Sequence, residues 1–382
     1  SKFPLPTWEK LSSIDHPVKK TMRVNEQYLD FVEIECRQRW KDSFKSLYPY
    51  RYLKAEKGRG RDGYVTNKRA LYFNKLMAIE HDFNIVNKGR KQGPVYVRDW
   101  TTLEEADESL KDLEYIQWYE FSDEVKELMK KKLQPSLKEL KCSSQCNSCT
   151  RPKRTADISS CCGMHESLDY CEQMNSLKLI DSDKPCTKSP FMVECTKACG
   201  CKAEKCRNRL TQRGRQKALL IFRDHVKEWT LRTLAPFRKN EFITWYCGTV
   251  YLSNTRGESQ HYDLSLVFDA VRENGEKNPL IVNAFERGNE SRFISHSCNP
   301  NSYIQPTIVS RKALSVNRAA IHAARNLEIG EEITMDYFGG RSLGDNDLGD
   351  VSSMFPEGCK CGSGNCRFTK DLVDNFNKKS RK

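Results

Sequence analysis

Seventeen cysteines are the clearest chemical signal in this chain, because they are not spread evenly along it. Eleven lie from Cys142 to Cys206, three lie from Cys359 to Cys366, and Cys298 lies far from its neighbours. Two cysteines separated by two or three residues can bind one tetrahedral zinc ion. A disulfide framework is the alternative, but dense disulfides are typical of short secreted domains, and no signal peptide is visible. The spacing therefore favours zinc.

The first group of cysteines fits a cluster of three zinc ions. Three tetrahedral ions need twelve ligand positions, and nine cysteines supply them when three thiolates each bridge two ions. Adjacent cysteines and cysteines one residue apart suit such bridging, because their sulfurs tend to point toward different metals. Cys171 and Cys186 are left over. The nine expected ligands are Cys142, Cys146, Cys149, Cys161, Cys162, Cys195, Cys199, Cys201 and Cys206.

Five stretches in order along the chain resemble the Su(var)3-9-type SET-domain histone lysine methyltransferases. ECTKACGCKAEKCRNR (194–209) resembles the end of the pre-SET zinc cluster of this family. Residues 221–251 are similar to the opening of the SET domain, and GNESRFISHSCNPN (288–301) is similar to its central signature. EEITMDYF (331–338) resembles the segment with the catalytic tyrosine, and CKCGSGNC (359–366) resembles the post-SET motif. The resemblance extends from residue 142 to residue 368.

The resemblance implies a role for the isolated Cys298. In this family the cysteine of the central signature completes a tetrahedral zinc site with the three post-SET cysteines, here Cys359, Cys361 and Cys366. Zinc would then hold the C-terminal tail over the central signature and close the site. The connecting stretch 338–358 is rich in Gly, Ser and Asp, so we expect little apolar surface to order it. The chain would bind about four zinc ions in total.

The elements that must position these motifs are mainly strands. ALLIF, EFITWYCGTVYL, YDLSLVF, PLIVNAF and EEITMDYF are short β-branched and aromatic runs separated by turn residues. The family fold is a set of small curved sheets with α+β additions and a C-terminal pseudoknot, a rare connection. We expect residues 1–141 to form a separate, partly helical and basic region of no recognised family. Its predicted helices span 25–47 and 122–140, with an extended GPVYVRDW between them. The pre-SET cluster would span 142–210, the SET domain 211–340, and a flexible linker with the post-SET segment 341–382.

The family's cofactor is S-adenosylmethionine, and its reaction is an in-line transfer of a methyl group to a lysine amine. The enzyme must align the two groups and favour the uncharged amine by desolvation. By resemblance, Tyr337 is the catalytic tyrosine and Tyr246 also lines the lysine channel; for each, an ordinary core tyrosine is the alternative. The channel would further include Tyr262, Met335 and Phe338. Met335 occupies the position that tunes the number of methyl groups, and it has no hydroxyl to anchor a partly methylated amine, so we expect multiple methylation.

The cofactor site departs from the family pattern at several positions. The Lys-Gly-Trp-Gly turn is KEWT (227–230), and glycine permits backbone angles that Glu228 and Thr230 resist. Ser295 replaces asparagine before His296, for which a turn-capping role is the alternative, and Trp245, Thr249 and Asn283 also differ. The expected cofactor-binding residues are Lys227, Glu228, Trp229, Tyr246, Arg292, Phe293, Ser295, His296 and Phe368.

These departures keep a second function open, a catalytically weak or inactive zinc-stabilised SET scaffold that binds chromatin. We favour the active enzyme, because both tyrosines and the post-SET cysteines are retained. A zinc-finger nucleic-acid binder ranks third, since the cysteines lack the paired histidines of the common finger.

Composition is consistent with a chromatin protein. The chain has 382 residues and a formal charge of +13. Residues 51–75 hold eight Lys/Arg against two acids with aromatic residues between, which suits non-specific contact with nucleic acid, although a solvated face is the alternative. Residues 101–141 are acidic instead, and no apolar run is long enough to span a membrane. The start at Ser1 suggests a fragment. We expect a nuclear, chromatin-associated enzyme that acts on the histone H3 tail or nucleosome at lysine 9; the sequence leaves the oligomeric state open.

Overall fold

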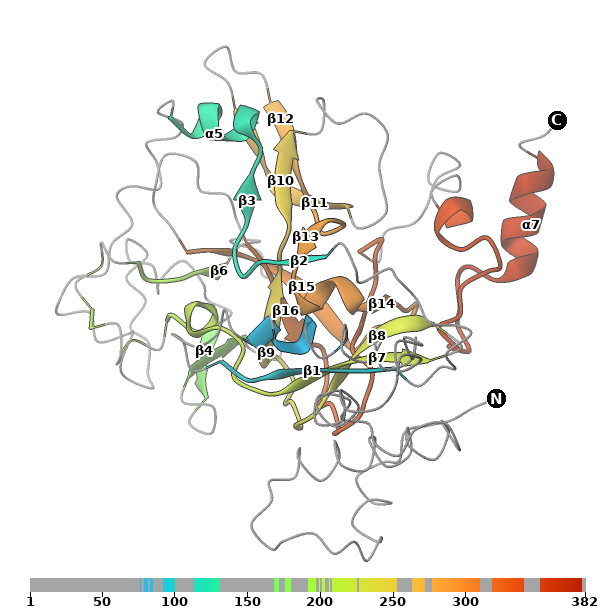
Figure 1. The fold of residues 1–382 in the computed structure, drawn as a ribbon, viewed down its shortest axis with the longest axis horizontal. Helices are drawn as coiled ribbons and strands as arrows, with labels where there is room; N and C mark the ends of the chain where they lie inside the picture. The colour runs from blue at the N-terminus through green and yellow to red at the C-terminus, as the bar shows by residue number, and fades with distance from the viewer. Residues whose placement is uncertain are drawn as a thin grey trace, which may run out of the picture.

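The computed structural model describes residues 76, 79–81, 83–84, 92–99, 113–130, 168–171, 176–179, 192–196, 199, 201–202, 206, 208–224, 227–252, 263–271, 277–309, 318–339 and 351–379. Short strands dominate these residues, as the sequence predicted (Figure 1). Among the helices described, none combines the length and apolar composition needed to cross a bilayer. The elements are β1 (Val95–Asp99), β2 (Glu114–Tyr115), β3 (Glu120–Phe121), α5 (Asp123–Lys130), β4 (Leu168–Cys171), β5 (Ser176–Leu179), β6 (Met192–Val193), the 3-10 helix η3 (Thr211–Arg213), β7 (Leu219–Asp224), β8 (Glu228–Thr233), β9 (Phe242–Tyr246), β10 (Thr249–Leu252), β11 (Asp263–Val271), β12 (Lys277–Asn283), β13 (Arg287–Gly288), the 3-10 helix η5 (Glu290–Phe293), β14 (Ser295–His296), β15 (Ser302–Ile308), β16 (Arg318–Ala323), β17 (Thr334–Met335) and α7 (Lys370–Lys379).

Three small sheets surround one hydrophobic core. Their strand orders are β1-β7-β8, β11-β12-β10-β3 and β6-β15-β16-β9, and the other strands form pairs. The core takes fully buried residues from all three sheets, among them Leu220, Val250 and Ile321. The β-branched runs identified in the sequence supply β7, β9, β10, β11 and β12, because β-branched side chains pack well on a pleated, half-buried surface.

The described strands of the first 141 residues pair with strands from later in the chain. β1 pairs in parallel with β7, β3 pairs with β10, and β2 pairs with β13. Val95 and Val97 of β1 are fully buried in the common core, so this strand and β7 share one set of core contacts. The predicted extended segment is β1 and a predicted helix includes α5, whereas the basic stretch 51–75 and the helix expected over 25–47 lie outside the described residues.

The central signature and the tyrosine segment lie side by side. β14 pairs in parallel with β17, in a register that places Ser295 opposite Thr334 and His296 opposite Met335. Asn301 reinforces this pairing, because its Oδ1 accepts from the Thr334 amide at 2.8 Å and its Nδ2 donates to the Glu332 carbonyl at 2.7 Å. Asn301 is almost fully buried, and sequence reasoning did not single it out.

Asn301→Ala is expected to lower the free energy of unfolding by about 1–3 kcal/mol, because it leaves a buried amide and a buried carbonyl without their partner. Urea denaturation followed by fluorescence measures the change. Asn326→Ala is the matched control, since Asn326 Oδ1 accepts from the exposed Lys239 amide at 2.9 Å and water can replace it there. Equal effects of the two substitutions would contradict the role given to Asn301.

The segment before the post-SET cysteines is more ordered than its composition predicted. Residues 351–354 form a helical turn, and Val351 is buried together with Phe338, Phe368 and Val373. Met354 and Phe355 pack against this group. Most of this stretch is Gly, Ser and Asp, but its few apolar residues pack against the rest of the protein. This packing orders the C-terminal part of the stretch without requiring a metal ion.

Candidate active site and metal centre

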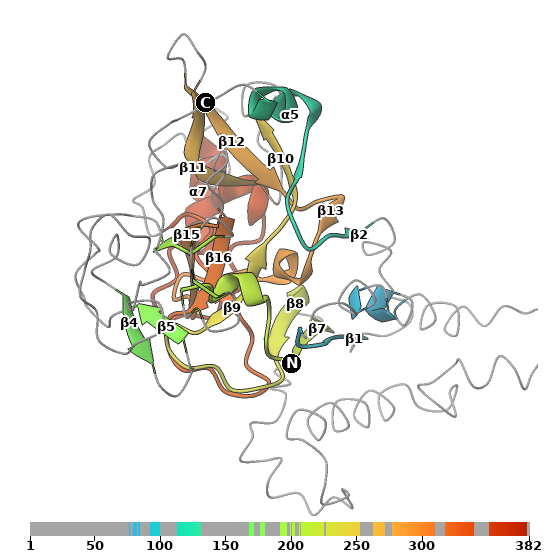
Figure 2. The same cartoon turned by 90° about the vertical axis from the view of Figure 1, so that its left-hand side faces the viewer.

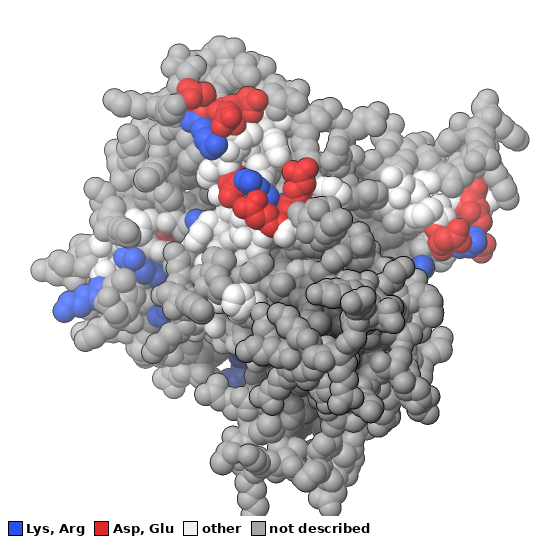
Figure 3. Space-filling view, viewed as in Figure 1, with Lys and Arg blue, Asp and Glu red and all other residues white. Residues whose placement is uncertain are grey.

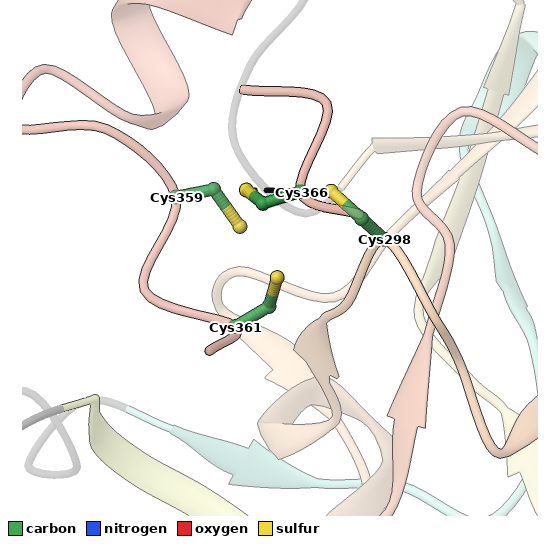
Figure 4. Close-up of side chains that lie close together, drawn as sticks. All are labelled: Cys298, Cys359, Cys361 and Cys366. Carbon is green, nitrogen blue, oxygen red and sulfur yellow. Dashed lines mark hydrogen bonds between the residues drawn. The ribbon is translucent and has the colours of Figure 1, made fainter. Parts of the chain in front are cut away.

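Four cysteines from distant parts of the chain converge on one point. The sulfurs of Cys298, Cys359, Cys361 and Cys366 all lie within 4.8 Å of one another, and the Cys298 and Cys366 sulfurs are 3.8 Å apart. Figure 4 shows Cys298, which follows β14, facing the three cysteines of the segment before α7. Thiolates bound to one tetrahedral zinc ion at 2.3 Å lie about 3.8 Å apart, so this group fits zinc.

Backbone amides donate to two of these sulfurs, those of Cys361 and Cys298, whereas burial raises the pKa of the Cys359 and Cys366 thiols. Burial alone would raise the pKa of the Cys361 thiol, but hydrogen bonds from the backbone amides of Cys298 and Ser363 lower this pKa to about 7. The Arg367 amide donates to the Cys298 sulfur at 3.2 Å. Such amide donors stabilise negative charge on sulfur, which is the form that binds zinc.

His296 connects the cysteine group to Tyr337. The backbone amide of Tyr337 donates to His296 Nδ1 at 3.2 Å, and His296 Nε2 lies 3.4 Å from the Cys298 sulfur. Because an amide can only donate, Nδ1 is the acceptor, and the ring proton lies on Nε2 and points toward the sulfur. Burial lowers the pKa of His296 to about 4, against the opposing effect of Asp336, so the ring is neutral at pH 7.

Aromatic rings pack around this histidine. The centroids of Tyr337, Phe338, Phe355 and Phe368 lie 5.2 to 5.7 Å from that of His296. Phe338 and Phe368 were expected near the channel and the cofactor, and both lie here. Phe355 was missed, although it is the only aromatic residue between Phe338 and Phe368 in the sequence.

Tyr337 and Tyr246, the two proposed catalytic residues, differ in their environments. Tyr337 is 42% exposed, and its hydroxyl donates to the Ile294 carbonyl at 2.7 Å. Tyr246 is only 4% exposed and packs in the central core, as Met335 also does. The Tyr337 proton is thus directed to the Ile294 carbonyl, which fixes the orientation of the hydroxyl. Tyr262 lies outside the described residues.

The KEWT turn keeps a left-handed conformation without glycine. Glu228 has φ = 61°, a region in which a residue with a Cβ loses roughly 1–2 kcal/mol. Lys227 Nζ forms an ion pair with Glu332 at 3.0 Å. The Trp229 ring packs against Phe293 of η5 with centroids 6.3 Å apart. The turn thus contacts both the central signature (288–301) and the tyrosine segment (331–338).

The other expected cofactor residues lie on η5 and β14. Arg292 is buried, donates from Nη1 to the Phe285 carbonyl at 2.8 Å, and places its guanidinium 5.4 Å from the Phe293 centroid. Ser295 is half-buried at the start of β14. The structure therefore brings η5, β14 and the KEWT turn together.

Only the second half of the expected three-zinc cluster is described. The sulfurs of Cys195, Cys201 and Cys206 lie within 4.8 Å of one another, and the Cys199 sulfur accepts from the Thr196 amide at 3.3 Å. These residues fit a shared metal as far as they are described. Cys171 is described only as part of the backbone of β4. The remaining expected ligands, with the leftover Cys186, lie outside the described residues: Cys142, Cys146, Cys149, Cys161 and Cys162.

Comparison with known proteins agrees with this geometry. Residues 228–338 match the SET domain family. A Xenopus tropicalis protein named histone-lysine N-methyltransferase SUV39H2 is 27% identical over 372 residues, which are 94% of this chain and 81% of that protein. The Drosophila melanogaster histone-lysine N-methyltransferase Su(var)3-9 is 31% identical over 46% of this chain, and human SUV39H2 is 32% identical over 46%. The aligned parts are only 28% and 44% of those two proteins.

Solved structures share the fold. The structure of KRYPTONITE in complex with mCHG DNA and SAH superposes with a TM-score of 0.52 at 21% identity, covering 73% of this chain and 51% of that chain. Arabidopsis thaliana SUVH6 in complex with SAM gives a TM-score of 0.52 at 19% identity, covering 75% and 55%. The spatial arrangement is therefore that of a SET fold, and the described residues include two groups of cysteines close enough to hold a metal.

Proposed function

We propose that this chain is a Su(var)3-9-type SET-domain histone lysine methyltransferase, which transfers methyl groups from S-adenosylmethionine to a lysine of a histone tail. The relatives are named for this activity, and SUVH6 is a SET-fold neighbour in complex with SAM. We place the protein in the nucleus, on chromatin, because its substrate would be there.

One observation supports an active site most directly: the four-cysteine group is connected to Tyr337 through a single side chain, His296. A scaffold that performs no chemistry would need the cysteines for folding. It would have no evident need of a half-exposed tyrosine whose amide and hydroxyl are both fixed by hydrogen bonds. The left-handed Glu228 also supports activity, because the turn expected to hold the cofactor adopts a backbone angle that glycine would favour although its glycine has been replaced.

The residues of the site have distinct proposed roles. S-adenosylmethionine supplies an electrophilic methyl group on a sulfonium. The KEWT turn, η5 and β14 bind the cofactor, and the aromatic rings around His296 exclude water. Tyr337 directs the lone pairs of its hydroxyl toward the transferred methyl group and the amine. Tyr246 and Phe338 line the channel, where desolvation favours the uncharged lysine. Zinc at the four cysteines holds the post-SET tail in place.

Histone H3 lysine 9 is the proposed substrate. Arabidopsis thaliana SUVH3 is named as H3 lysine-9 specific, and a second KRYPTONITE structure contains an H3(1-15) peptide. The face drawn in Figure 3 presents acidic groups over α5, and others over β2 and β3, where Glu114 and Glu120 both form ion pairs with Arg287. The first turn of α5, with Asp123 and Glu124, is the part of this face that would attract a lysine-rich tail. The nucleosome, and nucleic acid near the basic residues 51–75, are further proposed partners.

The test is a methyl-transfer assay with labelled S-adenosylmethionine and H3 peptides. Peptides of residues 1–15 with lysine 9 intact, and with lysine 9 or lysine 4 replaced by alanine, locate the target. We expect transfer to every peptide that retains lysine 9. Binding of the cofactor without transfer to any peptide would favour the scaffold function, and transfer that follows lysine 4 would contradict the proposed target.

The number of methyl groups added to the lysine tests the role of Met335. Its buried thioether cannot hold a water or anchor a partly methylated amine, so we expect mass spectrometry to find dimethyl and trimethyl lysine. Met335→Tyr adds a hydroxyl beside the amine and is expected to shift the product to mainly monomethyl lysine. Met335→Leu is the control, because it conserves volume and adds no hydroxyl. The proposal fails if the unmodified protein stops at one methyl group.

A further inference from the structure

The turn that we assign to the cofactor is fastened to the N-terminal part of the chain. Arg223 of β7 donates from Nε to Glu228 Oε2 at 2.8 Å and places Nη1 3.4 Å from Asp99 Oδ2. Asp99 is the last residue of β1, and in the parallel ladder it lies opposite Arg223. β1, β7 and β8 lie side by side in both views of the fold (Figures 1 and 2).

The three side chains of this contact differ in how deeply they are buried. The Asp99 side chain is 0% exposed and that of Arg223 is 7% exposed, whereas the Glu228 side chain is 61% exposed. The buried Asp99 carboxylate therefore fixes the Arg223 guanidinium within the sheet, and the Glu228 carboxylate contacts it from the solvent side. The guanidinium is also 5.9 Å from the Trp229 ring centroid. Arg223 is thus oriented by the buried Asp99, and this orientation directs its guanidinium toward Glu228 of the turn.

Glu228 is the residue whose backbone needs such support. Its φ of 61° is a conformation that glycine adopts freely and a glutamate does not. A glutamate here can, however, accept a charge-assisted hydrogen bond, which glycine cannot. The strained backbone angle and the compensating ion pair occur in the same residue.

We propose that Asp99, Arg223 and Glu228 act as a clamp that substitutes for glycine in the cofactor turn, so that strand β1 positions the turn. Arg223 is a positioning residue, because it acts through Glu228 and not on the cofactor itself. This inference rests on the proposed function, since it assumes that residues 227–230 bind S-adenosylmethionine. It gives the N-terminal strand a role beyond completing a sheet.

A double-mutant cycle tests the clamp. Arg223→Lys keeps the positive charge but loses the planar fork that reaches two carboxylates. We expect it to weaken binding of S-adenosylmethionine, measured by calorimetry, about fivefold in the chain with Glu228. In the Glu228→Gly background the same change is expected to weaken binding less than twofold, because glycine holds the conformation without help. Arg232→Lys is the matched control, since Arg232 lies on the same strand β8, stacks 5.1 Å over Phe222 and donates to the Gly330 carbonyl at 3.2 Å.

A second measurement does not depend on the cofactor. Amide hydrogen exchange at Trp229 and Thr230 in the protein alone is expected to become faster in Arg223→Lys and in Asp99→Asn, and not in Arg232→Lys. Equal effects of Arg223→Lys with Glu228 and with Gly at position 228, in both measurements, would overturn the clamp. If the unaltered protein binds no S-adenosylmethionine, the proposed function fails, and the exchange data still decide whether the clamp exists.

Discussion

Tyr337→Phe is expected to lower kcat for methyl transfer by about 100- to 1000-fold, while the dissociation constant of S-adenosylmethionine changes little. The hydroxyl donates to the Ile294 carbonyl at 2.7 Å, which fixes its orientation, and in the proposed mechanism its oxygen faces the reacting groups. Positive charge moves between the sulfonium and the amine during transfer, and an oriented acceptor stabilises it without reorganisation. Phenylalanine fills the same space and lacks that oxygen. Single-turnover kinetics with labelled cofactor measures the effect.

Tyr303→Phe provides a matched control for the loss of a tyrosine hydroxyl. Tyr303 lies on β15, and its hydroxyl donates to Asn240 Oδ1 at 3.2 Å, away from the site. We expect kcat to change less than twofold in this variant. A Tyr337→Phe enzyme as active as Tyr303→Phe would remove Tyr337 from the reaction.

Cys361→Ser is expected to release one zinc ion per chain and to abolish methyl transfer. Its thiol has a pKa of about 7, so at neutral pH it supplies a thiolate more readily than an ordinary cysteine does. A serine hydroxyl does not ionise near neutral pH and is a poor zinc ligand. The remaining three sulfurs would then hold the tail weakly, and the contact between Cys298 and His296 would no longer be fixed. Metal analysis and activity are measured on the same preparation.

Cys247→Ser is the control for the loss of a cysteine. Cys247→Ser is expected to retain all zinc, because Cys247 lies outside both cysteine groups and donates to the Gln117 carbonyl at 3.3 Å, a bond that serine can keep. The expected totals are about four ions in the unaltered chain and three in Cys361→Ser. An unchanged count in Cys361→Ser would mean that the four-cysteine group does not bind zinc.

The cysteine spacing and the motif order predicted much of the site before any coordinates. They predicted groups of metal-binding cysteines, two of which the structure brings close enough to hold an ion. The short β-branched runs predicted the strands on which the motifs lie, because both signals are local in the chain. The sequence could not show that β1, β2 and β3 pair with strands more than a hundred residues away. Two-residue strands such as β2 and β3 carry no periodicity of their own, and only their partners make them strands.

Residue types and their spacing predicted a dispersed set of metal-binding cysteines, and the family resemblance predicted a tyrosine for methyl transfer and a cofactor turn without its usual glycine. Tertiary structure decided which groups support them. The contact of His296 with both Cys298 and Tyr337, the bonds from Asn301 to Thr334, and the clamp on Glu228 all join residues through side-chain direction and burial. These properties depend on how strands pack against one another, and packing over long separations leaves no pattern in the order of residues.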